Sequence, residues 1–111
     1  MKQLVYGLAL LVLPAIANAN YGCSGTVNNL ALNPDGILTA TIGSLQNVYL
    51  CQIGTTRNGV SSDVCKAIFA HLLSAKTTGT LVQLQFSDSL TCTTHPAWSD
   101  LTGWYYGPDF Q

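Results

Sequence analysis

The chain has 111 residues with four lysines and arginines, five acidic residues and a formal net charge of −1. So few scattered cations exclude nucleic acid and argue against an anionic membrane surface, since both partners need a dense patch of positive charge. The length is that of a single small domain.

The first 19 residues have the organisation of an export signal. Lys2 stands near the start, an apolar stretch runs from 4 to 16, and Ala17-Asn18-Ala19 supplies small residues before the expected cleavage site. The apolar stretch is shorter than the roughly 20 residues that span a bilayer. We therefore expect a signal peptide over 1–19, a single domain over 20–111 without membrane insertion, and a secreted or periplasmic location.

Three strands are predicted next, over 26–32, 37–42 and 48–53. The first two are joined by Asn33-Pro34-Asp35-Gly36, a sequence typical of a turn, because proline fixes its own φ and Gly36 accepts a positive φ. In the second strand apolar residues alternate with threonines, which is typical of a half-buried antiparallel strand.

A helix follows. Ser61-Ser62-Asp63 supplies a capping hydroxyl and an acid for the positive end of the helix dipole. Apolar residues then recur at helical spacing, namely Val64, Ile68, Leu72 and Ala75, with Cys65 and Phe69 beside them. The helix should end near Lys76, before Thr77-Thr78-Gly79.

Alternation with period two predicts a strand over 81–86, and the aromatic run 104–106 predicts a final strand. The order of three strands, a helix and two strands predicts a mixed α+β domain. It matches the OB-fold, a five-stranded Greek-key barrel with its helix between the third and fourth strands.

All four cysteines follow the leader, and an even set in an exported chain favours two disulfides. Cys51 ends the third strand and Cys65 opens the helix, while Cys23 precedes the first strand and Cys92 follows the fourth. The preferred pairs are Cys23 with Cys92 and Cys51 with Cys65, although the sequence alone leaves two other pairings open. Closely spaced cysteines of a zinc site are absent from the sequence, so we expect no metal.

No recognisable set of catalytic residues occurs, and we expect neither an enzyme nor a cofactor. His71 lies at the edge of the apolar helix face and His95 in an irregular segment without a nearby titrating partner. Sugar hydrolysis needs two carboxylates flanking the scissile bond, whereas the aspartates here are isolated. A Gly-x-Ser-x-Gly nucleophile motif is missing, and oxidised cysteines offer no thiolate.

Four aromatic residues near the end of the chain are the candidate binding residues: Trp98, Trp104, Tyr105 and Tyr106. Aromatic rings with a polar edge suit ligands that combine apolar and polar contacts, such as sugars or protein surfaces. The alternative is that the tryptophans fill the core.

Phe69 and Leu73 widen the apolar arc of the helix beyond the stripe that covers one sheet. A second neighbour is therefore expected. It is either another copy of the chain, which would make Phe69 and Leu73 residues of a homo-oligomer interface, or the aromatic tail of the same chain.

The stretch 48–86 resembles the receptor-binding B subunits of bacterial A-B toxins of the pertussis, subtilase cytotoxin and typhoid toxin branch, and related small exported proteobacterial proteins. The matching residues are Val48-Tyr49-Leu50-Cys51, Asn58-Gly59, Cys65, Leu72-Leu73-Ser74-Ala75 and Thr78-Gly79-Thr80-Leu81-Val82. The resemblance implies a disulfide-bonded OB-fold that assembles as a pentamer and binds cell-surface glycans, and it assigns no site residues.

The sequence therefore supports two hypotheses about function. The first is an exported, non-catalytic binding domain that recognises a glycan or a protein surface. The alternative is a periplasmic structural or inhibitory accessory protein that binds one bacterial partner.

Overall fold

The computed structural model describes residues 20–111, so the predicted signal peptide lies outside the described residues. In chain order the elements are β1 (Tyr21–Gly25), β2 (Val27–Leu32), β3 (Ile37–Ile42), β4 (Leu45–Gln52), α1 (Ser62–Thr78), β5 (Val82–Phe86) and β6 (Trp104–Phe110). Residues 87–103 carry no strand or helix and are called the β5–β6 connection below.

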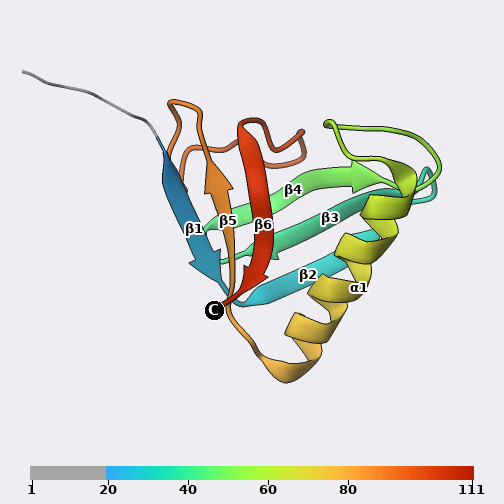
Figure 1. Cartoon of the computed structure of the whole chain (residues 1–111), viewed down its shortest axis with the longest axis horizontal. Coiled ribbons are helices and arrows are strands. Elements are labelled where there is room, and N and C mark those ends of the chain that lie inside the picture. The colour runs from blue at the N-terminus through green and yellow to red at the C-terminus, as the bar shows by residue number, and fades with distance from the viewer. Residues whose placement is uncertain (1–19) are drawn as a thin grey trace, which may run out of the picture.

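The strands form two three-stranded antiparallel sheets, ordered β1-β5-β6 and β2-β3-β4. In Figure 1 the strands of the first sheet run steeply across those of the second, and α1 lies along one side. The core lies between the sheets and under α1. Its fully buried side chains include Leu38, Ile42 and Leu50 from one sheet, Leu84 and Phe86 from the other, and Leu72 from α1.

The predicted five-stranded OB-like barrel is wrong, because the two sheets do not close into a barrel. The sequence prediction missed β1, whose two glycines give it a weak strand signal. Only Thr26 separates β1 from β2, and there the chain passes from one sheet to the other. Gly25 permits this by packing on the β3–β4 turn, where an added Cβ would lie 2.4 Å from the Cα of Gly43.

The 33–36 turn and the strand after it are confirmed, whereas the third strand, predicted over 48–53, begins earlier as β4 at Leu45 and ends at Gln52. The 33–36 turn forms, with the Gly36 amide donating to the Asn33 carbonyl at 2.9 Å and Gly36 at φ 88°. Leu38, Ala40 and Ile42 are buried in β3 as predicted, but Thr39 is buried as well, because β3 is the central strand of its sheet.

The helix begins as predicted and ends two residues later than predicted. The Ser61 hydroxyl accepts a hydrogen bond from the Val64 amide at 3.3 Å, and the left-handed Gly79, at φ 71°, ends the helix. The buried face comprises Cys65, Ile68, Leu72 and Ala75. Val64 was expected on this face and is instead 51% exposed.

Two disulfides are present, and they join the pairs preferred from the sequence. Cys51–Cys65 links β4 to α1, and Cys23–Cys92 links β1 to the β5–β6 connection. A native disulfide in a small domain is typically worth about 2–5 kcal/mol, and such bonds persist in oxidising compartments. Within residues 20–111, no helix has the length and apolar character needed to cross a membrane.

Candidate functional site

The β5–β6 connection is held against β4 by backbone hydrogen bonds. The Trp98 amide donates to the Asn47 carbonyl at 2.8 Å, and the Tyr49 amide donates to the Ser99 carbonyl at 3.0 Å. The Leu101 amide donates to Tyr49 in turn, and the Leu101 side chain is buried in the core. The connection is therefore fixed at Cys92 by a disulfide and over 98–101 by β4.

Trp98 combines an exposed side chain with a strained backbone. Its φ is +57°, and the other non-glycine residues with positive φ in the described chain are asparagines, which tolerate this conformation well. The left-handed conformation costs a residue with a Cβ about 1–2 kcal/mol. The Trp98 side chain is also 62% exposed, so burial of its ring does not account for its position. Strain of this kind concentrates at functional sites.

A pocket of about 300 Å³ lies beside Trp98. Its lining residues are Ser44, Gln46, Thr93, His95 and Ala97. Trp98 is not itself a lining residue. It follows the lining residue Ala97 in the chain, and its amide donates to the carbonyl of Asn47, which follows the lining residue Gln46. None of the lining residues carries a permanent charge, and the imidazole of His95 is buried. The pocket volume is at the lower end of about 300–1,000 Å³ for small-molecule sites.

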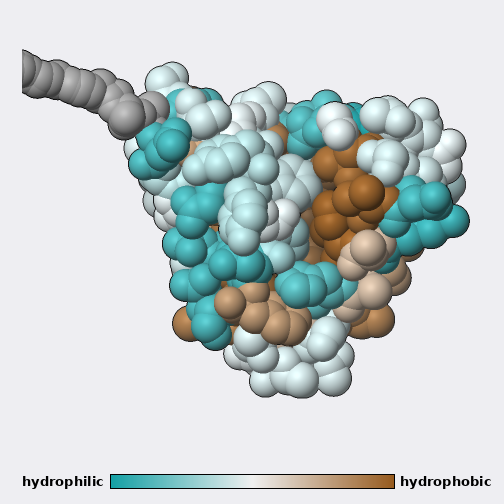
Figure 2. All heavy atoms as spheres, in the orientation of Figure 1, coloured by the Kyte–Doolittle hydropathy of each residue, from teal (hydrophilic) through white to brown (hydrophobic). Residues whose placement is uncertain are grey.

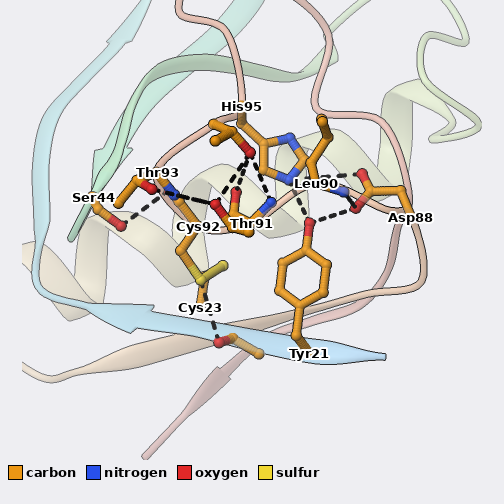
Figure 3. Close-up of a disulfide and its surroundings, with 11 residues drawn as sticks. Tyr21, Cys23, Ser44, Asp88, Leu90, Thr91, Cys92, Thr93 and His95 are labelled. Carbon is orange, nitrogen blue, oxygen red and sulfur yellow. Dashed lines mark hydrogen bonds and ion pairs between the residues drawn. A yellow bond between two sulfur atoms is a disulfide. The ribbon is translucent and has the colours of Figure 1, made fainter. Parts of the chain in front are cut away.

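A hydrogen-bonded network of Tyr21, Asp88 and His95 lies beneath this pocket (Figure 3). Tyr21 extends from β1, beside the Cys23–Cys92 disulfide, toward the two other residues. Its hydroxyl donates to Asp88 Oδ1, and His95 Nε2 lies 2.8 Å from the same hydroxyl. Because the single phenol proton is directed to Asp88, the phenol oxygen accepts from His95, and Nε2 therefore carries the imidazole proton.

His95 is the buried member of the network, whereas Tyr21 and Asp88 are partly exposed. The side chain of His95 is 1% exposed, and its Nδ1 has no hydrogen-bond partner among the described residues. Burial lowers the pKa of His95, against an opposing effect of the negative charge of Asp88. Burial also raises the pKa of Tyr21, and the hydrogen bond to Asp88 and the Asp88 charge add to this effect. At neutral pH His95 is thus neutral and Tyr21 protonated, as the hydrogen bonds require.

A second concave region lies between α1 and β6 and is called the α1–β6 groove. Two adjoining cavities of about 210 and 340 Å³ share Val64, Ile68 and Gly107 in their linings. Figure 2 shows this region as a hydrophobic surface between the two elements. His71 stacks on Phe110 at one end, with ring centroids 4.1 Å apart.

The structure does not gather the four predicted aromatic binding residues into one site. Trp104 and Tyr105 line the α1–β6 groove, where Trp104 is half-buried and donates its Nε1–H to the Gly107 carbonyl at 3.3 Å. Tyr106 is exposed on β6, and Trp98 lies on the β5–β6 connection. Trp98 is thus the predicted residue that stands beside the polar pocket.

The residues predicted for an oligomer interface differ in exposure. Phe69 is half-buried and packs against the core, whereas Leu73 is 47% exposed. Part of the helix surface is covered by the aromatic tail of the same chain, through the stacking of His71 on Phe110. Whether Leu73 contacts a second copy stays a prediction.

The Tyr21–Asp88–His95 network was not predicted, because its members are separated by 67 and 74 residues. The available signal was indirect: pairing of β1 with β5 sets Tyr21 opposite Phe86, close to Asp88. In residues 20–111 no group of three or more His, Cys, Asp or Glu side chains is arranged to hold a metal ion. No protein-family model, curated protein or solved structure matches the chain.

Proposed function

We propose that the protein is a secreted or periplasmic, non-catalytic binding domain that recognises a neutral glycan at the pocket beside Trp98. The proposal rests chiefly on Trp98, a strained and exposed tryptophan that is next in the chain to Ala97, a lining residue of a polar pocket. A sugar ring has an apolar face that packs on an aromatic ring and hydroxyl groups that hydrogen-bond to polar side chains. Trp98 and the Ser, Gln and Thr side chains of the pocket offer both kinds of contact.

The charge distribution favours a neutral ligand. The described residues carry five aspartates but only Arg57, Lys66 and Lys76 as permanent cations. Arg57 is already paired, since its Nε lies 2.8 Å from Asp100 Oδ1. The pocket lining contains none of these eight side chains. An ionic ligand would therefore lack a counter-charge at this site.

The local chemistry supports binding rather than catalysis. A general base must reach the proton that it abstracts, and the imidazole of His95 is enclosed and already hydrogen-bonded to Tyr21. Both disulfides are intact, so no thiolate is available as a nucleophile.

Trp98→Ala tests the proposal on a glycan array, with Tyr106→Ala as the matched control. Both side chains are exposed to a similar extent, 62% and 58%, but only Trp98 adjoins the pocket. We expect wild type and Tyr106→Ala to be retained by the same glycans at neutral pH and Trp98→Ala to lose retention while its far-UV circular dichroism is unchanged. Absence of any glycan bound by wild type, or equal retention of Trp98→Ala, would refute the proposal.

The α1–β6 groove favours a second candidate function, the accessory protein that binds one bacterial partner. Its exposed apolar residue Val64 and the aromatic Tyr105 are typical of a protein contact. Under this function, Val64→Asp would abolish co-purification of one periplasmic protein, and Trp98→Ala would not. The opposite pattern would argue against it.

A further inference from the structure

We propose that the Tyr21–Asp88–His95 network is an acid-sensitive latch: protonation of His95 releases the β5–β6 connection and disrupts the pocket beside Trp98. The consequence for ligand binding rests on the proposed function, because the same connection carries Trp98. The latch itself rests on the geometry of the three side chains and is testable without any ligand.

Two protons connect the three side chains of the latch, and Nε2 of His95 cannot take another. One proton lies between Tyr21 and Asp88, and the second lies between His95 and Tyr21. A further proton would go to Nδ1 of His95, which is enclosed and has no acceptor among the described residues. A buried cation with an unsatisfied N–H is strongly destabilising.

The surroundings of His95 offer limited compensation for that charge. From the end of β5, Asp88 Oδ2 lies 3.7 Å from Nε2 of His95, on the ring atom that is already protonated. From β1, Tyr21 is neutral. Phe86 of β5, with its ring centroid 4.6 Å away, is apolar, and the pocket residues Ser44 and Gln46 do not titrate. Asp88 is thus the one charged group that faces His95 in the described chain. Its Oδ1 is engaged by Tyr21 and by the Leu90 amide, while its Oδ2 has no hydrogen-bond partner and lies beyond hydrogen-bond distance of His95.

Acid therefore favours release. In the released connection His95 is in water, where its pKa is about 6.5. In the latched state burial lowers the pKa of the imidazole. Below about pH 6.5 the released state binds one more proton, so the ratio of released to latched molecules rises about tenfold per pH unit until the latched pKa is reached.

Release should be local rather than global. The connection contains no strand or helix, and Cys23–Cys92 keeps it attached to β1 when the latch opens. Release also relieves the left-handed conformation of Trp98. In the connection only His95 and Leu101 are buried, and segments with few buried contacts open at lower free energy than the core.

Amide hydrogen exchange at pH 7.5 and 5.0, corrected for intrinsic exchange rates, tests the latch by NMR. The reporters are the Leu90 amide, which donates to Asp88 Oδ1 at 3.1 Å, and the Trp98 amide, which donates to Asn47. We expect their protection to fall several-fold at pH 5.0, up to about thirtyfold where the latched pKa lies below 5, and that of the Leu72 amide in α1 to stay constant. Unchanged protection at Leu90 and Trp98 would overturn the proposal.

His95→Gln removes the titration but keeps an N–H that can donate to Tyr21, and His71→Gln is the control. We expect the pH dependence of protection to disappear in the first variant and persist in the second. Persistence in His95→Gln would overturn the latch. Because the substitution also removes the packing of the imidazole at every pH, the ring protons of His95 should also be titrated in wild type. A midpoint below about 6.5 supports the latch, and one at or above this value overturns it.

A glycan array at both pH values separates the two proposals. Loss of exchange protection in acid without any glycan bound at pH 7.5 would leave the latch standing and refute the proposed function. Equal glycan retention at both pH values would leave the proposed function standing and overturn the coupling of the latch to the pocket.

Discussion

Alanine variants are usually more stable than glycine variants at the same position, and the strained backbone of Trp98 predicts the opposite order there. Trp98→Ala and Trp98→Gly both remove the ring, so any burial of the ring cancels in their comparison. Alanine retains the left-handed cost of about 1–2 kcal/mol, which glycine avoids. Glycine in turn loses about 0.4–1 kcal/mol through the greater entropy of the unfolded chain. Trp98→Gly should therefore be more stable than Trp98→Ala by about 0.5–1 kcal/mol.

Ala97→Gly is the matched control. Ala97 is exposed, adjoins Trp98, and is not among the residues with positive φ. Here glycine should be less stable than the native alanine by about 0.4–1 kcal/mol, the ordinary sign. Opposite signs at neighbouring positions would assign the effect to the backbone conformation of Trp98.

Urea unfolding with both disulfides intact measures these differences. A change of 1 kcal/mol shifts the Tm of a domain of this size by about 4–8 °C, so calorimetry resolves the same effect. The reasoning would be refuted if Trp98→Gly were the less stable of the two variants. Both variants should lose glycan retention, because both lack the aromatic ring.

Three further predictions concern the frame of the domain. Replacing Cys23 and Cys92 by alanine should lower the free energy of unfolding by about 4 kcal/mol, and replacing Cys51 and Cys65 should lower it by about 3 kcal/mol. The first pair costs more because it closes the longer loop. Urea unfolding would show the reverse order if native-state packing rather than loop length dominated. Leu72→Ala should cost about 2–5 kcal/mol and Leu73→Ala under about 0.5 kcal/mol, since Leu72 is fully buried and Leu73 is 47% exposed; a large loss at Leu73, or a lower mass by sedimentation, would instead indicate a subunit contact. Because the folded pKa of His95 is lowered, its contribution to stability is complete above about pH 6.5 and is lost as the pH falls below it, by up to about 1.4 kcal/mol per unit. His95→Gln should flatten that part of the pH–stability curve, and an unaltered curve would contradict the assignment.

Features that depend on a few consecutive residues were predictable from the sequence. The 33–36 turn, the helix start at Ser61 and the alternation in β5 each depend on such residues, and all three are confirmed. The barrel was wrong because closure depends on which strands pair across the whole chain. The sequence of β1 has no recognisable strand pattern, and its partner β5 lies nearly 60 residues further along the chain, so local patterns do not predict their pairing.

The candidate site was predicted only in part, for a related reason. An aromatic-rich tail indicates binding residues, but exposure is decided by tertiary packing, which half-buries Trp104 and leaves Trp98 exposed. The positive φ of Trp98 has no sequence signature, because tryptophan disfavours that conformation. His95 has no partner in the local sequence pattern because Tyr21 comes to it from β1, and Asp88 lies seven residues before it in the same connection.

The distribution of crosslinks and strain suggests how such a small domain combines stability with an adaptable site. Cys51–Cys65 joins β4 to α1 and is buried in the core, whereas Cys23–Cys92 joins β1 to a connection without strands or helices. The first crosslink stabilises elements that already pack together. The second keeps Trp98 and the pocket near the sheets even when the latch is open. When the latch is open, this crosslink confines the residues of the connection to a small volume. The pocket then re-forms faster and at a smaller entropic cost than it would from a free loop. A binding site that is released in acid and restored at neutral pH requires this separation between a stable frame and a tethered, strained segment.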